Sequence, residues 1–314
     1  MLGYTLRRCG LSLAIVGLVM LGLFALLHLM PGDPAAIALG PRATPEVRAR
    51  YAAKMHLDQP VLVQLGVFAG NMLRGDLGED LFSGRPVTGI VMADLGRTLI
   101  LAAAGLGWSA VLGIALGCLS AVRPNGWFDR ITGVIAVGTI AIPSFLVSIW
   151  ALLIFAIWLG WLPVIGAGEP CNLWDQAHHL ILPAFAVGLG WVGYLARMVR
   201  ASMLEVLGEN YIRAARAAGL TERKVVWNYA LRMAILPTVT MLGIGFGSLL
   251  TGAVFAEIIF ARPGLGKLVY DMVETRNFPV VQGAVLVMTA VYVAVALLAD
   301  LAVAWLDPRV RHAL

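Results

Sequence analysis

Charged residues are scarce in this sequence. Of its 314 residues, 13% are Asp, Glu, Lys or Arg, whereas 60% are hydrophobic. Soluble domains carry about a quarter charged residues, so this composition argues against a soluble protein and predicts one that lies in a lipid bilayer. Cysteine is also rare: Cys9, Cys118 and Cys171 form no CxxC pair and allow no disulfide on the outer side of the membrane.

Motifs of enzymes and nucleotide-binding proteins are missing. The sequence contains neither Gly-x-Ser-x-Gly nor His-Glu-x-x-His. Residues 263–268 resemble a phosphate-binding loop, but Ala261 and Leu268 stand where a Walker A motif needs Gly and Ser or Thr. His178 and His179 are adjacent and would point about 100° apart on a helix, so they cannot share a metal as an i, i+4 pair could. We expect no catalytic residue, metal site or cofactor in this chain.

Six windows without charged residues are long enough to cross a bilayer, which takes about 20 apolar residues. They are Cys9–Gly32, Thr98–Val122, Ile131–Gly168, Gln176–Ala196, Met233–Ala256 and Asn277–Ala299. We predict six transmembrane helices, with a loop inside the long third window. Glu257 and Asp300 lie only at window edges, so the windows lack the buried acids of an ion-coupled secondary transporter.

Basic residues cluster on one side of these predicted spans. Arg7 and Arg8 precede the first, Arg123 and Arg130 separate the second and third, and seven basic residues fall between Arg197 and Arg232. The positive-inside rule then places both termini in the cytoplasm. The net charge of +5 follows mostly from this bias, so no nucleic-acid partner is needed.

The chain divides into three parts. Residues 1–32 hold the N-terminal segment and the first span, residues 33–96 form an extracytoplasmic segment with a predicted helix over Thr44–Met55, and residues 97–314 form a five-helix core. The loop over about 197–233 carries apolar residues at helical spacing, is interrupted by Gly219, and resumes after the N-cap candidate Thr221. Such a hairpin suits either an anionic lipid surface or docking to another protein.

Several sequence blocks resemble one family. The segments ARMVRASM at 196–203, YIRAARAAGL at 211–220 and ALRMA at 230–234 are similar to the EAA loop of ABC importer permeases for dipeptides, oligopeptides, glutathione and nickel, the B-type subunit in particular. Arg213, Tyr229 and Arg232 depart from the general EAA pattern. Further matches are Pro31–Pro34, Leu57–Pro60, Gly75–Gly78, Pro143 with Phe145, Gly160–Pro163, Ile181–Pro183, Pro263–Gly266 and Asp307–Val310.

The resemblance implies an all-α type I ABC importer permease in the bacterial inner membrane, with six spans, both termini inside and a cytoplasmic coupling hairpin. Its implied partners are a homologous second permease, two ATP-binding subunits that bind ATP and Mg and hydrolyse ATP, and an extracytoplasmic substrate-binding protein. The implied substrate is a short peptide, including glutathione-like peptides, and the alternative is nickel or a metal chelate.

The coupling hairpin supplies the first set of candidate site residues. They are Arg213, Ala214, Ala215, Arg216, Gly219 and Arg223. The small residues would let an ATPase subunit approach closely, and the arginines could pair with carboxylates. Gly219 would permit a left-handed turn, a role that is compatible with a plain helix C-cap.

A second set of candidates belongs to the translocation pathway or gate. Pro143, beside Ser144, removes a backbone donor and can kink a helix, which suits a pathway lining or an ordinary packing kink. Glu257 is either an outer gate residue or an interfacial residue. Asn277 stands where the family usually shows Asp, on the outer side, where it could touch a binding protein or substrate.

Overall fold

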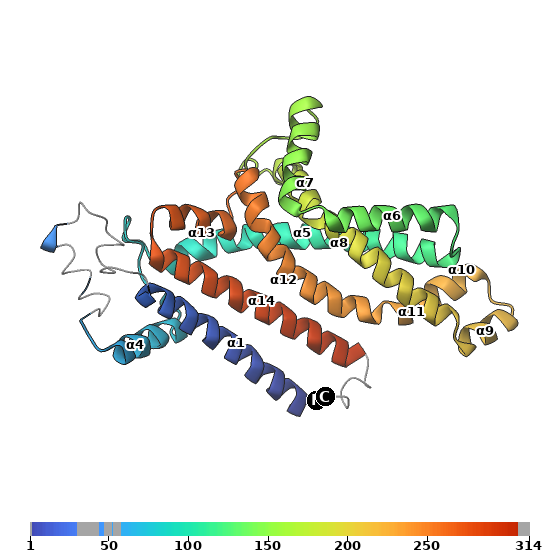
Figure 1. Ribbon diagram of the computed structural model, residues 1–314, viewed down its shortest axis with the longest axis horizontal. Coiled ribbons are helices and arrows are strands. Elements are labelled where there is room, and N and C mark those ends of the chain that lie inside the picture. Colours follow the sequence, from blue (N-terminus) through green and yellow to red (C-terminus); the bar gives the residue numbers. More distant parts are fainter. Residues whose placement is uncertain (1, 30–43, 47–51, 53–57, 307–314) are drawn as a thin grey trace. The chain divides into compact units, whose positions relative to one another are not determined.

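The computed structural model describes residues 2–29, 44–46, 52 and 58–306, and these residues are predominantly helical (Figure 1). The predicted helix over Thr44–Met55 lies largely outside them. The helices are α1 (Leu2–Leu29), α4 (Val61–Leu73), α5 (Val87–Val122), α6 (Trp127–Ala141), α7 (Ser144–Ala151), the π-helical η1 (Leu152–Trp158), α8 (Leu173–Leu207), α9 (Asn210–Ala217), α10 (Glu222–Lys224), the π-helical η2 (Val225–Ala230), α11 (Leu231–Ala234), α12 (Leu236–Ile259), α13 (Leu265–Glu274) and α14 (Phe278–Leu306).

Among the described residues, five helices are long and apolar enough to cross a membrane, namely α1, α5, α8, α12 and α14. A sixth candidate is the pair formed by α6 and α7–η1, which is bent by 100°. The bend falls where the third window was expected to contain a loop: Ile142 is extended at φ −88° and ψ 121°, and Pro143 caps α7. The proline ring disfavours a helical conformation at Ile142, which explains the break.

The chain forms two compact units, the first made of residues 1–5, 98–262 and 295–314. Within it α8 packs against α6, α7 and α12. Glycines bring α8 very close to its neighbours: a Cβ on Gly117 of α5 would lie 2.5 Å from the Ala196 carbonyl oxygen, and one on Gly193 of α8 would lie 2.5 Å from that of Ala136 in α6. Small residues at such crossings let apolar helices associate within a membrane.

Side chains of α5 also bond to the α8 backbone. The Trp108 indole nitrogen donates to the Ala184 carbonyl at 2.8 Å, and the Ser109 hydroxyl donates to the Gly188 carbonyl at 2.8 Å. Hydrogen bonds of this kind add to small-residue packing between spanning helices. The α5–α8 contact is therefore both close and polar at its centre.

The second unit comprises residues 6–97 and 263–294. Its apolar core contains Leu77, Val87, Val91, Leu265, Val280 and Ala284. Asn277 is fully buried there and donates from Nδ2 to the Asp80 carboxylate. Burial raises the pKa of Asp80, but hydrogen bonds from Ser83 and Asn277 outweigh it and hold that pKa below its ordinary value. The expectation that Asn277 is free to touch a binding protein or substrate is therefore wrong.

Candidate functional site

The coupling hairpin, residues 208–234, is a folded element with its own core. Ile212 and Ala215 of α9 and Val225, Val226 and Ala230 of η2 are buried against each other. The same core contains Cys118 and Ala121 of α5, Val199 and Met203 of α8, and Ala234 of α11. The hairpin is thus packed onto the ends of α5 and α8.

Gly219 makes the turn of the hairpin as predicted. Its φ is +80°, and the amides of Gly219 and Leu220 donate back to the carbonyls of Arg216 and Ala215 at 3.0 and 3.3 Å. These two bonds form the Schellman motif, in which a left-handed residue satisfies the last carbonyls of a helix. A glycine is favoured here because of the backbone conformation, since no side chain or backbone atom lies within 4 Å of where its Cβ would be.

The predicted coupling residues lie on two faces of the hairpin. Arg213, Ala214, Arg216 and Arg223 are exposed, whereas Ala215 is buried in the hairpin core. Ala215 therefore packs inward and cannot offer close approach to a partner. Arg216 is bound within the hairpin, with its Nε 2.8 Å from Oε1 of Glu222.

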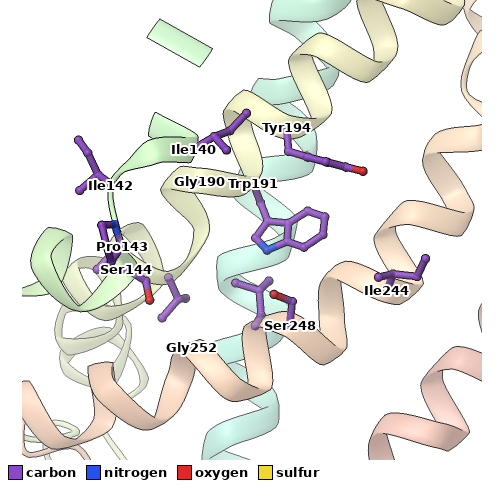
Figure 2. A pocket seen from close by; sticks show the side chains of 13 residues that line it. Ile140, Ile142, Pro143, Ser144, Gly190, Trp191, Tyr194, Ile244, Ser248 and Gly252 are labelled. Atoms are coloured by element: carbon purple, nitrogen blue, oxygen red, sulfur yellow. The ribbon is translucent and has the colours of Figure 1, made fainter. Parts of the chain in front are cut away.

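A cavity of about 470 Å³ lies between the α6–α7 break, α8 and α12 (Figure 2). Pro143 and Ser144, two of the candidates for the pathway or gate, line it at the break. Sequence reasoning missed the other contributors: Ile140 and Ile142; Ala186, Val187, Gly190, Trp191 and Tyr194 of α8; and Ile244, Ser248, Leu249 and Gly252 of α12. Nothing in their spacing distinguishes these residues from lipid-facing or core residues.

The side chains around the cavity are apolar, aromatic or neutral and polar. Figure 2 shows the Trp191 indole directed into the space between α8 and α12, near Ser248. Gly245 lies under this ring, since a Cβ there would be 3.0 Å from Cζ3 of Trp191. The Trp191 and Tyr194 rings meet edge to face at 5.3 Å between centroids. Among the described residues that line the cavity, none is charged.

Glu257 lies near the end of α12, which runs to Ile259, so its place at the edge of a span agrees with the sequence interpretation. Its side chain is fully buried, which the sequence did not indicate. Its carboxylate accepts a hydrogen bond from the Thr98 hydroxyl of α5 at 2.6 Å. Glu257 is not among the residues that line the cavity, and its hydrogen bond with Thr98 joins α12 to α5.

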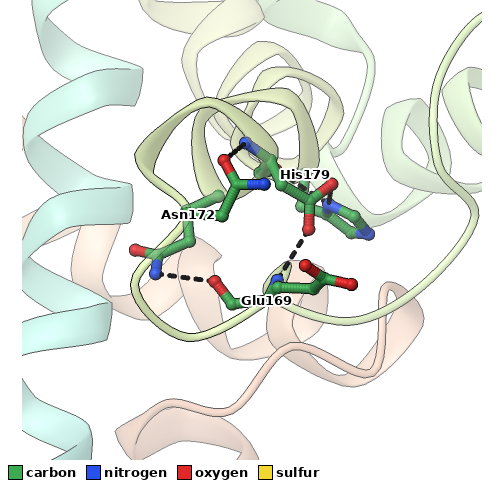
Figure 3. Close-up of polar contacts among 5 residues, drawn as sticks. Glu169, Asn172 and His179 are labelled. Atoms are coloured by element: carbon green, nitrogen blue, oxygen red, sulfur yellow. Dashed lines mark hydrogen bonds and ion pairs between the residues drawn. The ribbon is translucent and has the colours of Figure 1, made fainter.

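The loop before α8 is ordered by its own polar groups (Figure 3). Asn172 caps α8 by accepting from the Asp175 amide at 3.2 Å, and Asp175 Oδ2 accepts from the Glu169 amide at 2.6 Å. His179 Nδ1 lies 2.9 Å from the Asp175 carbonyl oxygen. Cys171 is exposed at φ +72°. Across residues 58–306 and the shorter described stretches, no group of three His, Cys, Asp or Glu side chains could hold a metal.

An ion pair between α6 and α8 was not foreseen from the sequence. Arg200 donates from Nε to Asp129 Oδ1 at 2.5 Å and from Nη2 to Asp129 Oδ2 at 2.7 Å. The Asn125 amide donates to the same carboxylate at 2.8 Å. The two residues are 71 positions apart, so no local pattern could have paired them.

Comparison with known proteins gives two family matches. Residues 113–312 match the model described as "Binding-protein-dependent transport system inner membrane component", and residues 1–99 match the N-terminal model of the same kind of component. Together they cover most of the chain, including the cavity and the coupling hairpin.

Curated relatives match over full length. The glutathione transport system permease protein GsiC of Pectobacterium atrosepticum is 38% identical over 99% of this chain and 100% of its own length. GsiC of Escherichia coli K12 is 36% identical over the same shares. A chain of the MetNI methionine ABC transporter in an inward-facing conformation has a similar fold, with a TM-score of 0.57 at 19% identity over 69% of this chain and 95% of that one.

Proposed function

This chain belongs to the binding-protein-dependent transport system inner membrane components, as a permease subunit of an ABC importer, and we propose that it forms half of a pathway for short peptides. Glutathione-like peptides are the proposed substrate class, because the similar proteins are glutathione permeases. The other half would come from a homologous permease, and two ATP-binding subunits would hydrolyse ATP. An extracytoplasmic binding protein would deliver the peptide at the bacterial inner membrane.

One observation carries this proposal: a single helix, α8, lines the cavity and also holds the coupling hairpin. Trp191 and Tyr194 of α8 face the cavity, while Val199 and Met203, about two turns further on, are buried in the hairpin core. A rigid helix moves both ends together. A movement imposed on the hairpin by an ATPase would therefore reach the cavity wall directly.

The chemistry of the cavity suits a peptide. Ser144 and Ser248 offer hydroxyl groups to peptide amides and carbonyls, and Trp191 and Tyr194 offer aromatic surface to side chains. Imidazole is a good protein ligand for nickel, and the described lining residues carry hydroxyl, phenol and indole groups instead. This difference favours the peptide over a bare nickel ion.

The exposed face of the hairpin suits an ATPase groove on the cytoplasmic side, with both chain termini on that side as well. Arg213 and Arg223 are exposed and could pair with acidic side chains of the ATPase, while Ala214 would allow close approach. Arg216 shapes the hairpin through Glu222. Residues 33–96, on the opposite side, would face the binding protein.

The test is uptake into proteoliposomes that hold this chain, its sister permease, both ATPases and the binding protein. Labelled glutathione, a dipeptide and nickel are compared with and without ATP. We expect ATP-dependent uptake of a peptide, reduced several-fold by Trp191→Ala. Trp174→Ala is the matched control, because Trp174 is 81% exposed and lies outside the cavity.

Each result has a distinct meaning. Nickel uptake without peptide uptake would replace the proposed substrate, and uptake without ATP would overturn the ATP-driven mechanism. Equal losses in the Trp191 and Trp174 variants would show that the cavity is not the peptide pathway.

A further inference from the structure

The Asp129–Arg200 ion pair joins two elements whose relative position matters for the proposed function. Asp129 lies in the first turn of α6 and its side chain is 6% exposed, while Arg200 lies on α8 and its side chain is 34% exposed. Both guanidinium–carboxylate hydrogen bonds are short. The pair is bidentate, which fixes the orientation of the two groups as well as their distance. A lysine could not reproduce it.

Arg200 sits at the base of the coupling hairpin. Its neighbour Val199 is fully buried in the hairpin core, as is Met203 one turn later. On the α5 side, a Cβ on Gly117 would lie 3.0 Å from the Arg200 amide nitrogen. The backbone at Arg200 is therefore fixed against both α5 and the hairpin.

The α6 helix is attached to α8 at two levels. Close packing of Gly193 against Ala136 and Thr139 is one, and the Arg200–Asp129 pair is the other. The two points on α8 are seven residues apart, about 10 Å along the helix. α6 packs extensively against α8, and the ion pair adds a bond of fixed direction at the end of α6 far from the cavity.

The far end of α6 forms part of the cavity. After Asp129 the helix runs to Ala141, and Ile140, Ile142, Pro143 and Ser144 at its end line the cavity. Any rotation of α6 about the Gly193 contact would therefore displace this wall. The ion pair at the opposite end of α6 resists that rotation.

We propose that Asp129 and Arg200 form a latch that makes α6, and with it one wall of the cavity, move as a rigid body with α8 and the coupling hairpin. These are positioning residues, since neither touches the cavity. The inference rests on the proposed function, in which the hairpin receives the movement of an ATPase. When the ion pair is broken, the ATPases still hydrolyse ATP, but α6 and the cavity wall no longer move with α8. Fewer peptides are then transported per ATP.

The first test is the number of ATP molecules hydrolysed per peptide taken up, measured in the full complex. The first variant is Arg200→Lys, which keeps the positive charge but cannot form the bidentate pair. The second is the double change Asp129→Asn with Arg200→Gln, which leaves no unpaired buried charge. We expect assembly and basal ATPase activity within about twofold of the native complex and an ATP-to-peptide ratio raised several-fold. Arg97→Gln, which removes an exposed ion pair with Asp94 on α5, is the matched control and leaves the ratio unchanged.

The second test does not depend on transport. Spin labels are placed on α6 at exposed Val134 and on the hairpin at exposed Ala217, with Cys9 and Cys171 changed to Ser and Cys118 to Ala. The distance between the labels stays constant on ATP binding in the native complex and changes in the Arg200→Lys variant. This measurement separates the latch from the transport assay, because it needs ATP binding alone.

The latch is disproved if both variants keep the native ATP-to-peptide ratio, or if the label distance in the native complex changes with ATP as much as in the variant. An absence of ATP-dependent uptake in the native complex itself would instead count against the proposed function. In that case the constant label distance still supports the latch.

Discussion

The two ends of the α8 segment that carries function are built differently. At the hairpin end, Val199 and Met203 are fully buried among apolar side chains. Arg200, which lies between them in the sequence, forms a bidentate ion pair with Asp129. At the cavity, Trp191 is half-buried and Tyr194 is 41% exposed, and Gly245 lies beneath the indole ring. Dense packing transmits displacement, whereas side chains that border a cavity have room to change their positions. The comparison suggests that the hairpin end of α8, here called the lever, is stiff. The residues around the cavity near Trp191, here called the wall, can adjust their positions.

The largest loss of stability is expected where α5 contacts the hairpin end of α8. Gly117→Val would place side-chain atoms where the Ala196 carbonyl and Val199 now lie, since even a Cβ would be 2.5 and 2.8 Å from them. Forcing the helices apart costs about 3 kcal/mol, and we expect a large loss of thermal stability in the purified permease. Gly107→Val on the same helix has open space and should melt within a few degrees of native. Equal melting of the two variants would show that the contact is not tight.

Gly219→Val tests whether coupling needs the left-handed turn of the hairpin. A β-branched residue at φ +80° costs about 1–3 kcal/mol, so we expect the hairpin to distort and uptake to fall about tenfold. Gly219→Asn is the control, because asparagine tolerates the left-handed conformation, and it should keep most of the uptake. Normal uptake with valine would remove Gly219 from the coupling mechanism.

The second unit offers a tight polar site for comparison with the apolar lever. The stability that Asp80 contributes is present above its unfolded-state pKa of about 3.9 and is lost as the pH falls through its lower folded-state pKa. Asn277→Asp replaces a donor with a buried carboxyl beside the partly exposed carboxyl of Asp80. At pH 7 we expect a loss of about 1–3 kcal/mol, which shrinks in acid as the new carboxyl takes up a proton and donates to Asp80.

Thermal unfolding of the Asn277 variant between pH 4.5 and 8 measures this effect. Asn172→Asp is the matched control, because either residue can cap α8 by accepting from the Asp175 amide, so its pH profile should follow the native one. A native melting temperature at pH 7.5 in the Asn277 variant would contradict the assigned hydrogen bond.

The smallest effect is expected at the adjustable wall. Gly245→Ala places a methyl group 3.0 to 3.1 Å from three atoms of the Trp191 ring, which must shift by a few tenths of an ångström. Because the ring borders open space, we expect little change in stability and a change of about two- to fivefold in the relative uptake of short and longer peptides. Gly252→Ala, with ordinary contact to Ser144 at 3.5 Å, serves as the control. A loss of stability as large as that of Gly117→Val would erase the distinction between lever and wall.

Much of the architecture could be predicted because it depends on local patterns. Long apolar windows, Pro143 and the glycine at 219 predicted the spans, the break and the hairpin turn, which the structure confirms. The sequence placed Glu257 at the edge of a span, close to the end of α12 at Ile259, but gave no sign of its burial or of its hydrogen bond with Thr98. A helix can bury an acid that finds a hydrogen-bond partner on a neighbouring helix, and local hydropathy does not reveal that partner.

The sequence by itself determined that the chain consists of helices able to span a bilayer and where those helices break and turn. It also supplied the motifs that resemble a transport family. These follow from hydropathy and backbone preference, which act over a few residues. Tertiary structure decided which face of each helix is used. It turned Ala215 inward, buried Asn277 against Asp80, gathered Ser144, Trp191 and Ser248 around one cavity, and paired Asp129 with Arg200. Those outcomes depend on the close approach of helices distant in sequence, which periodicity cannot encode.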